Sequence, residues 1–311
     1  MNLTELKPSN EWTQNRSTYI GGSDCAAILG ASAYSTPLQV YLRKKGHLPP
    51  ITDNPIMDFG HYFEPQLAAY FEAETGLKTR RVNQPFTHPK HEFLKANIDR
   101  QVLAGKGLDS TAVLELKTTT SYRYKALDGT IPREWQLQIQ HYLGITGYKK
   151  AFLQVYLRDT CEFLEPQIIE PYPELIEDMT HKLVKWWTTY MLDGSEGRRP
   201  EAINGDDALL LYPDSSPEEV VEITPAGFVL YEELTRVRDR KTDLIKQEEH
   251  LKTKLKDKLG KAERLVCGGK TLVSWKSHSS KRIDSKAIQR EHPNFYKQYS
   301  NTINTRRFLC H

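Results

Sequence analysis

The sequence has little cysteine and no long hydrophobic run. Its four cysteines, among 311 residues, are far apart and form no CxxC or Cys/His spacing, which argues against a zinc site and a disulfide framework. We expect buried, reduced thiols. No apolar run approaches the roughly 18 residues of a membrane span, and no signal-peptide pattern is present. The composition therefore predicts a soluble, cytoplasmic protein without a membrane partner. The cysteines are Cys25, Cys161, Cys267 and Cys310.

A strong excess of one charge is also absent, since the formal net charge is only +3. That total hides an asymmetry. Residues 265–311 contain nine Lys or Arg and two Asp or Glu, a net +7, which leaves −4 for residues 1–264. An acidic body with a basic tail favours metal-binding carboxylates in one part and an anionic partner for the other. A solvated basic surface would give the same composition, so this pattern alone does not select a function.

Residues 1–204 carry the pattern of an α/β domain. Helix-forming runs alternate with short runs that suit strands, an order that indicates helices packed on a mixed sheet. The expected helices begin at IGGSDCAAILG and lie at 57–75, where Gly76 is the stop, at 133–143 and at 173–192; the expected strands lie within 93–117 and at 150–157.

A polar stretch with Pro and Gly predicts a linker to a second region, residues 205–311. Residues 224–265 are strongly helical, with an interrupted heptad pattern that favours a packed helix or helical hairpin over a free coiled coil. Two strand-like runs around Gly268 and Gly269 then predict a β-hairpin. A tail that mixes cations and aromatics follows.

One strand-like run, AVLELK, carries the first candidate chemistry. Strand alternation places Glu115 and Lys117 on one face and the neighbouring leucines on the other. An exposed ion pair on any surface strand would look the same. The context adds an acid, Asp99 in KANID, and two glutamines, Gln138 and Gln140, on the helix that follows.

Five motifs, in this order, resemble a known family. They are RSTYIGGSD, GHYFE, KANID, AVLELKTT and WQLQIQHYL. The acids, the lysine and the glutamine helix are similar to those of the PD-(D/E)xK nucleases, and the full set resembles the lambda exonuclease and YqaJ-type viral recombinase family. The resemblance covers about residues 12–192 and, more loosely, the VSWK and RRF segments of the tail. It implies a restriction-endonuclease-like α/β core, a mixed central sheet flanked by helices, with a helical and β-hairpin C-terminal extension.

The chemistry of that family gives roles to the central residues. Hydrolysis of a phosphodiester needs a cation, and hard oxygen ligands suit Mg²⁺ or Mn²⁺, as one or two ions. Asp99 and Glu115 are the candidate ligands, and the resemblance implies that the main-chain carbonyl of Leu116 joins them. Lys117 would then orient or polarise the attacking water.

The helices contribute the other implied site residues. Glu64, in GHYFE, corresponds to a helix glutamate at the metal site of the family, with a solvent-facing position as the alternative. Gln138 corresponds to the active-site glutamine, whose amide both donates and accepts. Gln140 is the neighbouring candidate and otherwise points at the sheet. Trp135 and Tyr142 are expected to be core aromatics.

The resemblance also implies a phosphate site. Arg16 and Ser23 match residues that capture the 5′ phosphate of the degraded strand in related enzymes, where arginine gives bidentate contacts. Asn97 and Arg123 stand at positions that would hold further phosphate. A simple helix cap is the alternative for Ser23.

The first metal ligand is where the sequence departs from the family pattern. Ile98 replaces the usual proline, and sixteen positions separate Asp99 from Glu115. The interval leaves room for Asp109 as a rival ligand if the intervening hairpin is tight. We expect Asp99, because KANID resembles the family motif.

The function implied by the resemblance is 5′ to 3′ degradation of linear double-stranded DNA, which leaves 3′ single strands for phage-type recombination. It further implies a ring-shaped homotrimer, a phage single-strand annealing protein as partner, and action in a bacterial or phage-infected cell. Two alternatives stay open: a structure- or sequence-specific endonuclease with the same metal core, and a non-catalytic DNA-binding or assembly protein.

Overall fold

The computed structural model describes residues 16–51, 54–125, 130–192, 194, 197–301 and 306–309. Contacts divide the chain into two compact units, Met1–Leu211 and Tyr212–His311. We call them unit 1 and unit 2 and describe each by itself. Within the described ranges, no helix combines the length and the apolar character needed to cross a membrane.

Unit 1 is built on a mixed sheet. The described strands follow the order β1-β4-β5-β6-β7, and β8 also pairs with β6. Strands β5 and β6 are parallel, whereas every other pair in this sheet is antiparallel. Parallel neighbours need a crossover connection, which helix α6 supplies here. The strands are β1 (Thr79–Arg80), β4 (Arg100–Val102), β5 (Ala112–Thr119), β6 (Ala151–Leu157), β7 (Glu162–Phe163) and β8 (Gln167–Ile169), with a separate antiparallel pair of β2 (Phe86–Thr87) and β3 (Lys95–Ala96).

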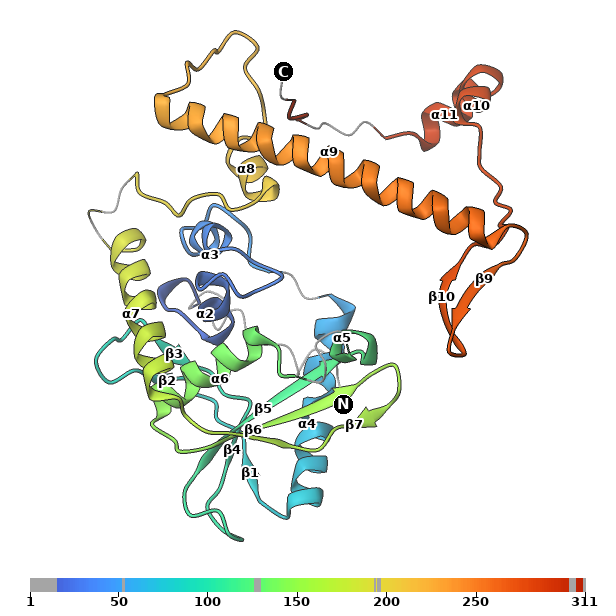
Figure 1. Ribbon diagram of the computed structural model, residues 1–311. Helices are drawn as coiled ribbons and strands as arrows, with labels where there is room; N and C mark the ends of the chain where they lie inside the picture. Colours follow the sequence, from blue (N-terminus) through green and yellow to red (C-terminus); the bar gives the residue numbers. More distant parts are fainter. Residues whose placement is uncertain are drawn as a thin grey trace. The chain divides into compact units, whose positions relative to one another are not determined.

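Helices cover both faces of this sheet (Figure 1). On one face, Val113 of β5 belongs to a core shared with α2, α6 and α7. On the other face, Leu114 and Leu116 pack with residues of α4. The mixed sheet flanked by helices, expected from the sequence, is confirmed. The helices of unit 1 are η2 (Arg16–Thr18), α2 (Gly22–Ile28), α3 (Pro37–Lys44), α4 (Pro55–Thr75), α5 (Ser121–Lys125), α6 (Arg133–Thr146), α7 (Pro173–Tyr190) and α8 (Gly205–Leu211).

The ends of α4 follow local signals in the sequence. The side chain of Asn54 accepts hydrogen bonds from the backbone N–H groups of Ile56 and Met57, which have no partner within the helix. At the other end, Gly76 takes a left-handed conformation with φ of 68°, which glycine adopts without steric cost. The stop predicted at Gly76 is therefore confirmed.

Helix α8 belongs to unit 1 because Asp207 anchors it. The buried carboxylate accepts hydrogen bonds from Thr36 Oγ1 at 2.8 Å and from Gln39 Nε2 at 3.3 Å, both at the start of α3. It also accepts from the backbone N of Ile203 at 3.1 Å. The contacts of unit 1 therefore extend past residue 204 to Leu211. A division of function between the two units stays a prediction.

The described part of unit 2 consists of a long helix, a β-hairpin and two short helices. The predicted hairpin is confirmed, with Gly268 and Gly269 at φ of 54° and 78° between its strands. The helical hairpin that was one of the two expectations for residues 224–265 is not formed, and packing of the long helix on unit 1 stays a prediction. Helix α9 is uninterrupted and fully described, and of its residues Leu259 alone is buried. Its surface carries i,i+4 ion pairs, each of which stabilises a helix by about 0.2–0.5 kcal/mol. The elements are α9 (Pro225–Leu259), β9 (Arg264–Cys267), β10 (Lys270–Ser274), α10 (Ser285–Glu291) and α11 (Pro293–Tyr299).

The cysteines differ in exposure. Cys25 is buried and forms no disulfide with the other described cysteines, as predicted. Burial raises the pKa of its thiol, so that it stays protonated. Cys161 and Cys267 are exposed, so the expectation of burial was wrong for both. Cys310 lies outside the described residues.

Candidate active site

The sheet places Asp99 beside the middle of β5. The register pairs Arg100 of β4 with Leu114 of β5, so that the residue preceding β4 lies opposite Glu115. The side chain of Asp99 here replaces a backbone carbonyl as the acceptor between the two strands. Its Oδ2 accepts a hydrogen bond from the backbone N of Leu116 at 2.8 Å. The chain reversal between the two strands thus brings two acids, sixteen positions apart, next to each other.

Glu115 and Lys117 lie on the face of β5 that α6 covers, as strand alternation predicted. The ammonium Nζ of Lys117 is 2.6 Å from Glu115 Oε1. Only 1% of the Glu115 side chain is exposed. A surface ion pair, the alternative for this motif, is therefore wrong. A buried carboxylate needs a partner for each oxygen, because an unpaired buried charge is strongly destabilising.

Helix α6 supplies Gln138 to this pair. Its Nε2 donates to Glu115 Oε1 at 2.8 Å, and its Oε1 accepts from Lys117 Nζ at 3.1 Å. The first of these contacts goes to Oε1, the oxygen of Glu115 that Lys117 also holds. The other oxygen, Oε2, is buried and has no hydrogen-bond partner in the described part of the chain.

Helix α4, which covers the other face of the sheet, brings Glu64 to Arg100, the residue after Asp99. Glu64 Oε1 pairs with the guanidinium of Arg100, which also donates to the backbone O of Asp99 at 2.7 Å. The Glu64 side chain is 22% exposed, so the solvent-facing alternative is wrong. Arg100 was not predicted as a site residue from the sequence. The only signal for it was an arginine directly after the first acid of KANID.

The electrostatics show that three acids are crowded together. Burial, followed by the charges of Glu115 and Glu64, raises the pKa of Asp99 well above its usual value. Burial also raises the pKa of Glu115, although the Lys117 ammonium opposes the shift. Burial would lower the pKa of Lys117, but Glu115 and Asp99 raise it, so the lysine stays charged. The cluster therefore favours an additional positive charge.

These residues fit a hard divalent cation. Asp99 and Glu115 offer carboxylate oxygens, of which Glu115 Oε2 is buried without a partner. Since the N–H and C=O of a strand residue point to the same neighbour, the carbonyl of Leu116 is directed to the side on which Asp99 lies. No three His, Cys, Asp or Glu side chains among the described residues gather into a metal cluster of their own. Two carboxylates, one carbonyl and water are nevertheless a set that suits Mg²⁺.

A second polar group lies at the start of α2. The guanidinium NH2 of Arg16 donates to Ser23 Oγ at 2.7 Å. The cap alternative for Ser23 is wrong, because the N-cap is Gly21, whose N–H donates to Asp24 Oδ2 at 3.1 Å. Burial would raise the pKa of Asp24, but Lys44, at 2.9 Å, and Arg16 hold it below its usual value. The acid is therefore ionised, and Ser23 keeps an exposed hydroxyl.

Asn97 joins this second group, whereas Arg123 forms contacts elsewhere. Asn97 Nδ2 donates to the hydroxyl of Tyr19 at 3.1 Å, and the Tyr19 ring lies against Gly21. Arg123 is 2.6 Å from Glu134 and stacks over the ring of Tyr34, 5.0 Å from its centre. A role of Arg123 in phosphate binding would require it to leave or share Glu134.

Asp109 and Gln140 are not brought to the acids. Asp109 is exposed and follows the turn of the β4–β5 hairpin, six positions before Glu115 and three before β5 begins. Gln140 faces the other way along α6, where it donates to the backbone O of Glu170 and accepts from the backbone N of Tyr172, both at 2.8 Å. The fold therefore places Asp99 and Gln138 beside Glu115, and leaves their rivals Asp109 and Gln140 elsewhere.

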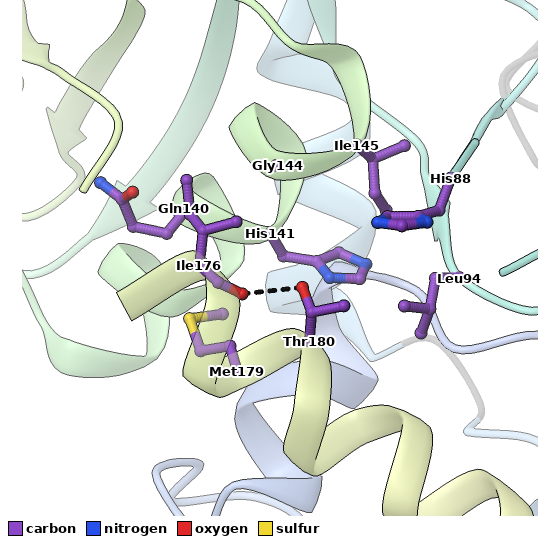
Figure 2. A pocket seen from close by; sticks show the side chains of 9 residues that line it. All are labelled: His88, Leu94, Gln140, His141, Gly144, Ile145, Ile176, Met179 and Thr180. Atoms are coloured by element: carbon purple, nitrogen blue, oxygen red, sulfur yellow. Dashed lines mark hydrogen bonds between the residues drawn. The ribbon is translucent and has the colours of Figure 1, made fainter. Parts of the chain in front are cut away.

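A small cavity beside Gln140 does not form a second site. Figure 2 shows the nine side chains around it, with Gln140 and His141 extending in different directions from α6. Its volume is about 10 Å³, at the lower limit of what one water molecule occupies. Burial lowers the pKa of His141 to about 4, so this histidine is a neutral core residue.

Tyr142 was predicted from the sequence to be a core aromatic and no more. The ring is indeed in the core of unit 1 and is 4% exposed. Its hydroxyl, however, accepts a hydrogen bond from Gln138 Nε2 at 2.9 Å. Helical spacing offered a signal, since a residue four positions after Gln138 lies on the same face of α6.

Comparison with known proteins agrees with the motifs. Residues 11–149 match the model of the YqaJ-like viral recombinase domain. The chain is similar to the uncharacterized protein YqaJ of Bacillus subtilis (strain 168), with 30% identity over 308 residues that cover 96% of this chain and 93% of the relative.

Solved structures show a more distant likeness. The alkaline exonuclease LHK-Exo from Laribacter hongkongensis has 20% identity and a TM-score of 0.48, over 58% of this chain and 92% of that one. A phage-related exonuclease from Haemophilus somnus 129PT has 13% identity and a TM-score of 0.42, over 55% of this chain and 93% of that one.

Proposed function

The chain belongs to the YqaJ-like viral recombinase family, and on this premise we propose that it is a Mg²⁺-dependent exonuclease. It would degrade linear double-stranded DNA from 5′ ends and leave 3′ single strands for recombination by strand annealing. One observation carries the chemistry. Two carboxylates, Asp99 and Glu115, meet beside a half-buried lysine and a half-buried glutamine, and one oxygen of Glu115 has no partner among the described residues.

The residues of this cluster divide the work of phosphodiester hydrolysis. Asp99, Glu115 and the Leu116 carbonyl would hold Mg²⁺ or Mn²⁺, which neutralises charge on the scissile phosphate and makes a nucleophile available from water. Lys117 is held between Glu115 and Gln138, where its ammonium would orient the attacking water and stabilise the additional negative charge. Gln138 keeps that ammonium in place without changing the net charge of the site.

The group at the start of α2 supports a preference for 5′ ends. Arg16 and the exposed hydroxyl of Ser23 offer a charged fork and a neutral donor side by side, a combination that suits a phosphate. A terminal phosphate carries more negative charge than an internal one. Binding there would fix which end of the strand reaches the acids, with Asn97 as a further donor near Tyr19.

The family resemblance supports the remaining parts of the proposal. These are a ring-shaped homotrimer that encloses DNA, a phage single-strand annealing protein as partner, and action in the cytoplasm of a bacterial or infected cell. Unit 2 would serve these contacts, because residues 265–311 carry a net +7 and cations attract the phosphate backbone irrespective of sequence.

The test is digestion of three DNA substrates with Mg²⁺ or EDTA. They are a linear duplex with 5′ phosphates, the same duplex with 5′ hydroxyls, and a covalently closed circle. We expect Mg²⁺-dependent loss of the phosphorylated linear duplex, slower loss of the hydroxyl form, and an intact circle. Glu115→Gln, which keeps the shape of the side chain and removes its charge, should lower the rate at least about 100-fold.

Asp109→Asn is the matched control, because it removes an exposed acid that lies on the same hairpin but outside the cluster. It should retain the wild-type rate. Cutting of the circle would replace the exonuclease by an endonuclease. DNA that is bound but left intact with Mg²⁺ would indicate a binding or assembly protein and refute the proposed function.

A further inference from the structure

Tyr142 lies between the two polar groups of the proposed site. A Cβ atom on Gly22 would come within 2.6–2.7 Å of Cε1, Cζ and Oη of the Tyr142 ring, closer than any side chain can approach. Glycine therefore allows α2 to rest directly on this ring. The next residue, Ser23, is the one that Arg16 contacts. One aromatic ring thus sets the distance between α6 and the part of α2 that carries the proposed phosphate-binding residue Ser23.

The hydroxyl of the same tyrosine acts on the other polar group. Gln138 Nε2 donates to Tyr142 Oη at 2.9 Å and to Glu115 Oε1 at 2.8 Å. Its Oε1 faces the ammonium of Lys117 at 3.1 Å. With two acceptors on its nitrogen side and a cation on its oxygen side, the amide has one favourable orientation. The reversed amide would direct its oxygen at Glu115 and its N–H groups at Lys117, and both contacts would be repulsive.

From these contacts we infer that Tyr142 is a positioning residue that holds the Gln138 amide against Glu115 and Lys117 and supports the phosphate-binding helix through Gly22. The catalytic part of this inference rests on the proposed function. It assigns to Tyr142 no contact with DNA. The tyrosine instead keeps the two groups that would touch DNA in fixed positions relative to each other.

Tyr142→Phe separates the two contacts of this residue. It removes the hydroxyl and retains the ring beneath Gly22. Because a side-chain hydrogen bond contributes a modest net amount, kcat should fall about fivefold to tenfold with Mg²⁺, while KM stays within about twofold. Binding of the 5′-phosphorylated duplex in EDTA, and its preference over the 5′-hydroxyl form, should remain unchanged. A general loosening of the core would weaken that binding as well.

Gly22→Ala tests the contact from the other side. The added methyl group has to displace α2 or the ring, so both kcat and the preference for a 5′ phosphate should fall. If the loss in kcat arises through the Tyr142 hydroxyl, the same substitution should lower kcat much less in the Tyr142→Phe background. If Gly22→Ala lowers kcat by the same factor with and without the Tyr142 hydroxyl, the link between Gly22 and Gln138 is overturned.

A spectroscopic measurement decides the positioning role without metal or DNA. In protein labelled with ¹⁵N-glutamine, the Gln138 side-chain amide is identified by its absence from Gln138→Ala. Tyr142→Phe should move its proton resonances upfield, because one acceptor is lost. Tyr148→Phe is the matched control. Tyr148 accepts from the side-chain amide of Gln101 in the same way, so its removal should move the Gln101 resonances and leave Gln138 unchanged.

The outcomes separate this inference from the proposed function. If the wild-type protein leaves all DNA intact, the proposed function fails, while the Gln138 resonances still decide whether Tyr142 positions the amide. If the wild-type protein degrades DNA and Tyr142→Phe changes neither kcat nor the Gln138 resonances, the inference is overturned and the proposed function stands.

Discussion

Asp99→Asn is expected to stabilise the metal-free protein and to remove its stabilisation by Mg²⁺. The amide oxygen of asparagine can still accept the hydrogen bond that the backbone N of Leu116 donates at 2.8 Å. The substitution therefore removes the charge and preserves the contact. Since burial and the neighbouring acids raise the pKa of Asp99, the ionised carboxylate costs the folded protein free energy that the asparagine does not.

The size of the effect follows from the charges around Asp99. Two like charges about 4–5 Å apart repel each other by about 3–4 kcal/mol at an effective dielectric constant near 20. The Lys117 ammonium, which lowers the pKa of Asp99, offsets part of this repulsion. We expect a gain of about 1.5 kcal/mol in the free energy of unfolding in EDTA, which for a domain of this size corresponds to a Tm higher by about 3–6 °C.

Mg²⁺ should make the wild-type protein more stable than Asp99→Asn, the reverse of their order in EDTA. An ion that binds only the folded wild-type protein stabilises it by about 2.7 kcal/mol when its concentration is about 100 times Kd. The variant lacks one ligand and gains much less. Thermal unfolding followed by tryptophan fluorescence reports mainly on unit 1, which holds the buried Trp135, Trp186 and Trp187, whereas Trp275 of unit 2 is exposed. Asp109→Asn is the control and should behave like the wild-type protein in EDTA and in Mg²⁺.

The pH dependence of the free energy of unfolding tests whether the ionised Asp99 destabilises the folded protein. A raised pKa means that the folded protein holds a proton over a range where the unfolded chain has lost it. The wild-type protein in EDTA should therefore lose stability as pH rises from about 4 through that range. The advantage of the variant should vanish below about pH 4, where Asp99 is protonated in both states. A variant less stable than wild type in EDTA at pH 7, or equally stabilised by Mg²⁺, would refute the reasoning.

Four other substitutions test three separate parts of the structure. Arg16→Gln should lower the preference for 5′-phosphorylated over 5′-hydroxyl DNA about tenfold, measured by competition binding in EDTA, and unchanged preference would exclude Arg16 from the phosphate site. Gln138→Ala should lower kcat at least about tenfold, whereas Gln140→Ala should cost about 1–3 kcal/mol of stability and leave kcat of the folded protein unchanged. Asp207→Ala should destabilise unit 1 by about 2–4 kcal/mol in urea unfolding, because buried donors around it lose their acceptor; a variant of wild-type stability would contradict that anchoring.

Much of unit 1 could be predicted because its signals are local. Gly76 ends α4 through its own backbone freedom, and the two faces of β5 follow from alternation along a single strand. The choice between Asp99 and Asp109 was different. It depends on how β4 pairs with β5, and only the register shows that Asp99 lies opposite Glu115. A motif supplied the right preference there, but the physical reason is the pairing of strands.

The residues that the sequence did not predict act through contacts between distant segments. Arg100 reaches Glu64, 36 positions earlier, and Tyr142 packs on Gly22 from a helix more than a hundred positions away. No periodicity within one element encodes such contacts. The choice between one long helix and a helical hairpin could not be made from the sequence for a different reason, since a heptad pattern indicates which side chains share a stripe and not which surface covers them.

The parallel pairing of β5 with β6 has a consequence for synthesis of the protein on the ribosome. A nascent chain that ends at residue 140 already contains every acid, lysine and glutamine of the proposed catalytic cluster. It lacks Tyr142 and the whole of β6, whose neighbour Lys150 accepts from Val113, and a parallel strand cannot join the sheet until its crossover is complete. The emerging polypeptide would therefore be harmless to the DNA around it until residues near Leu157 have left the ribosome, so that assembly of the sheet acts as a built-in delay before cutting begins.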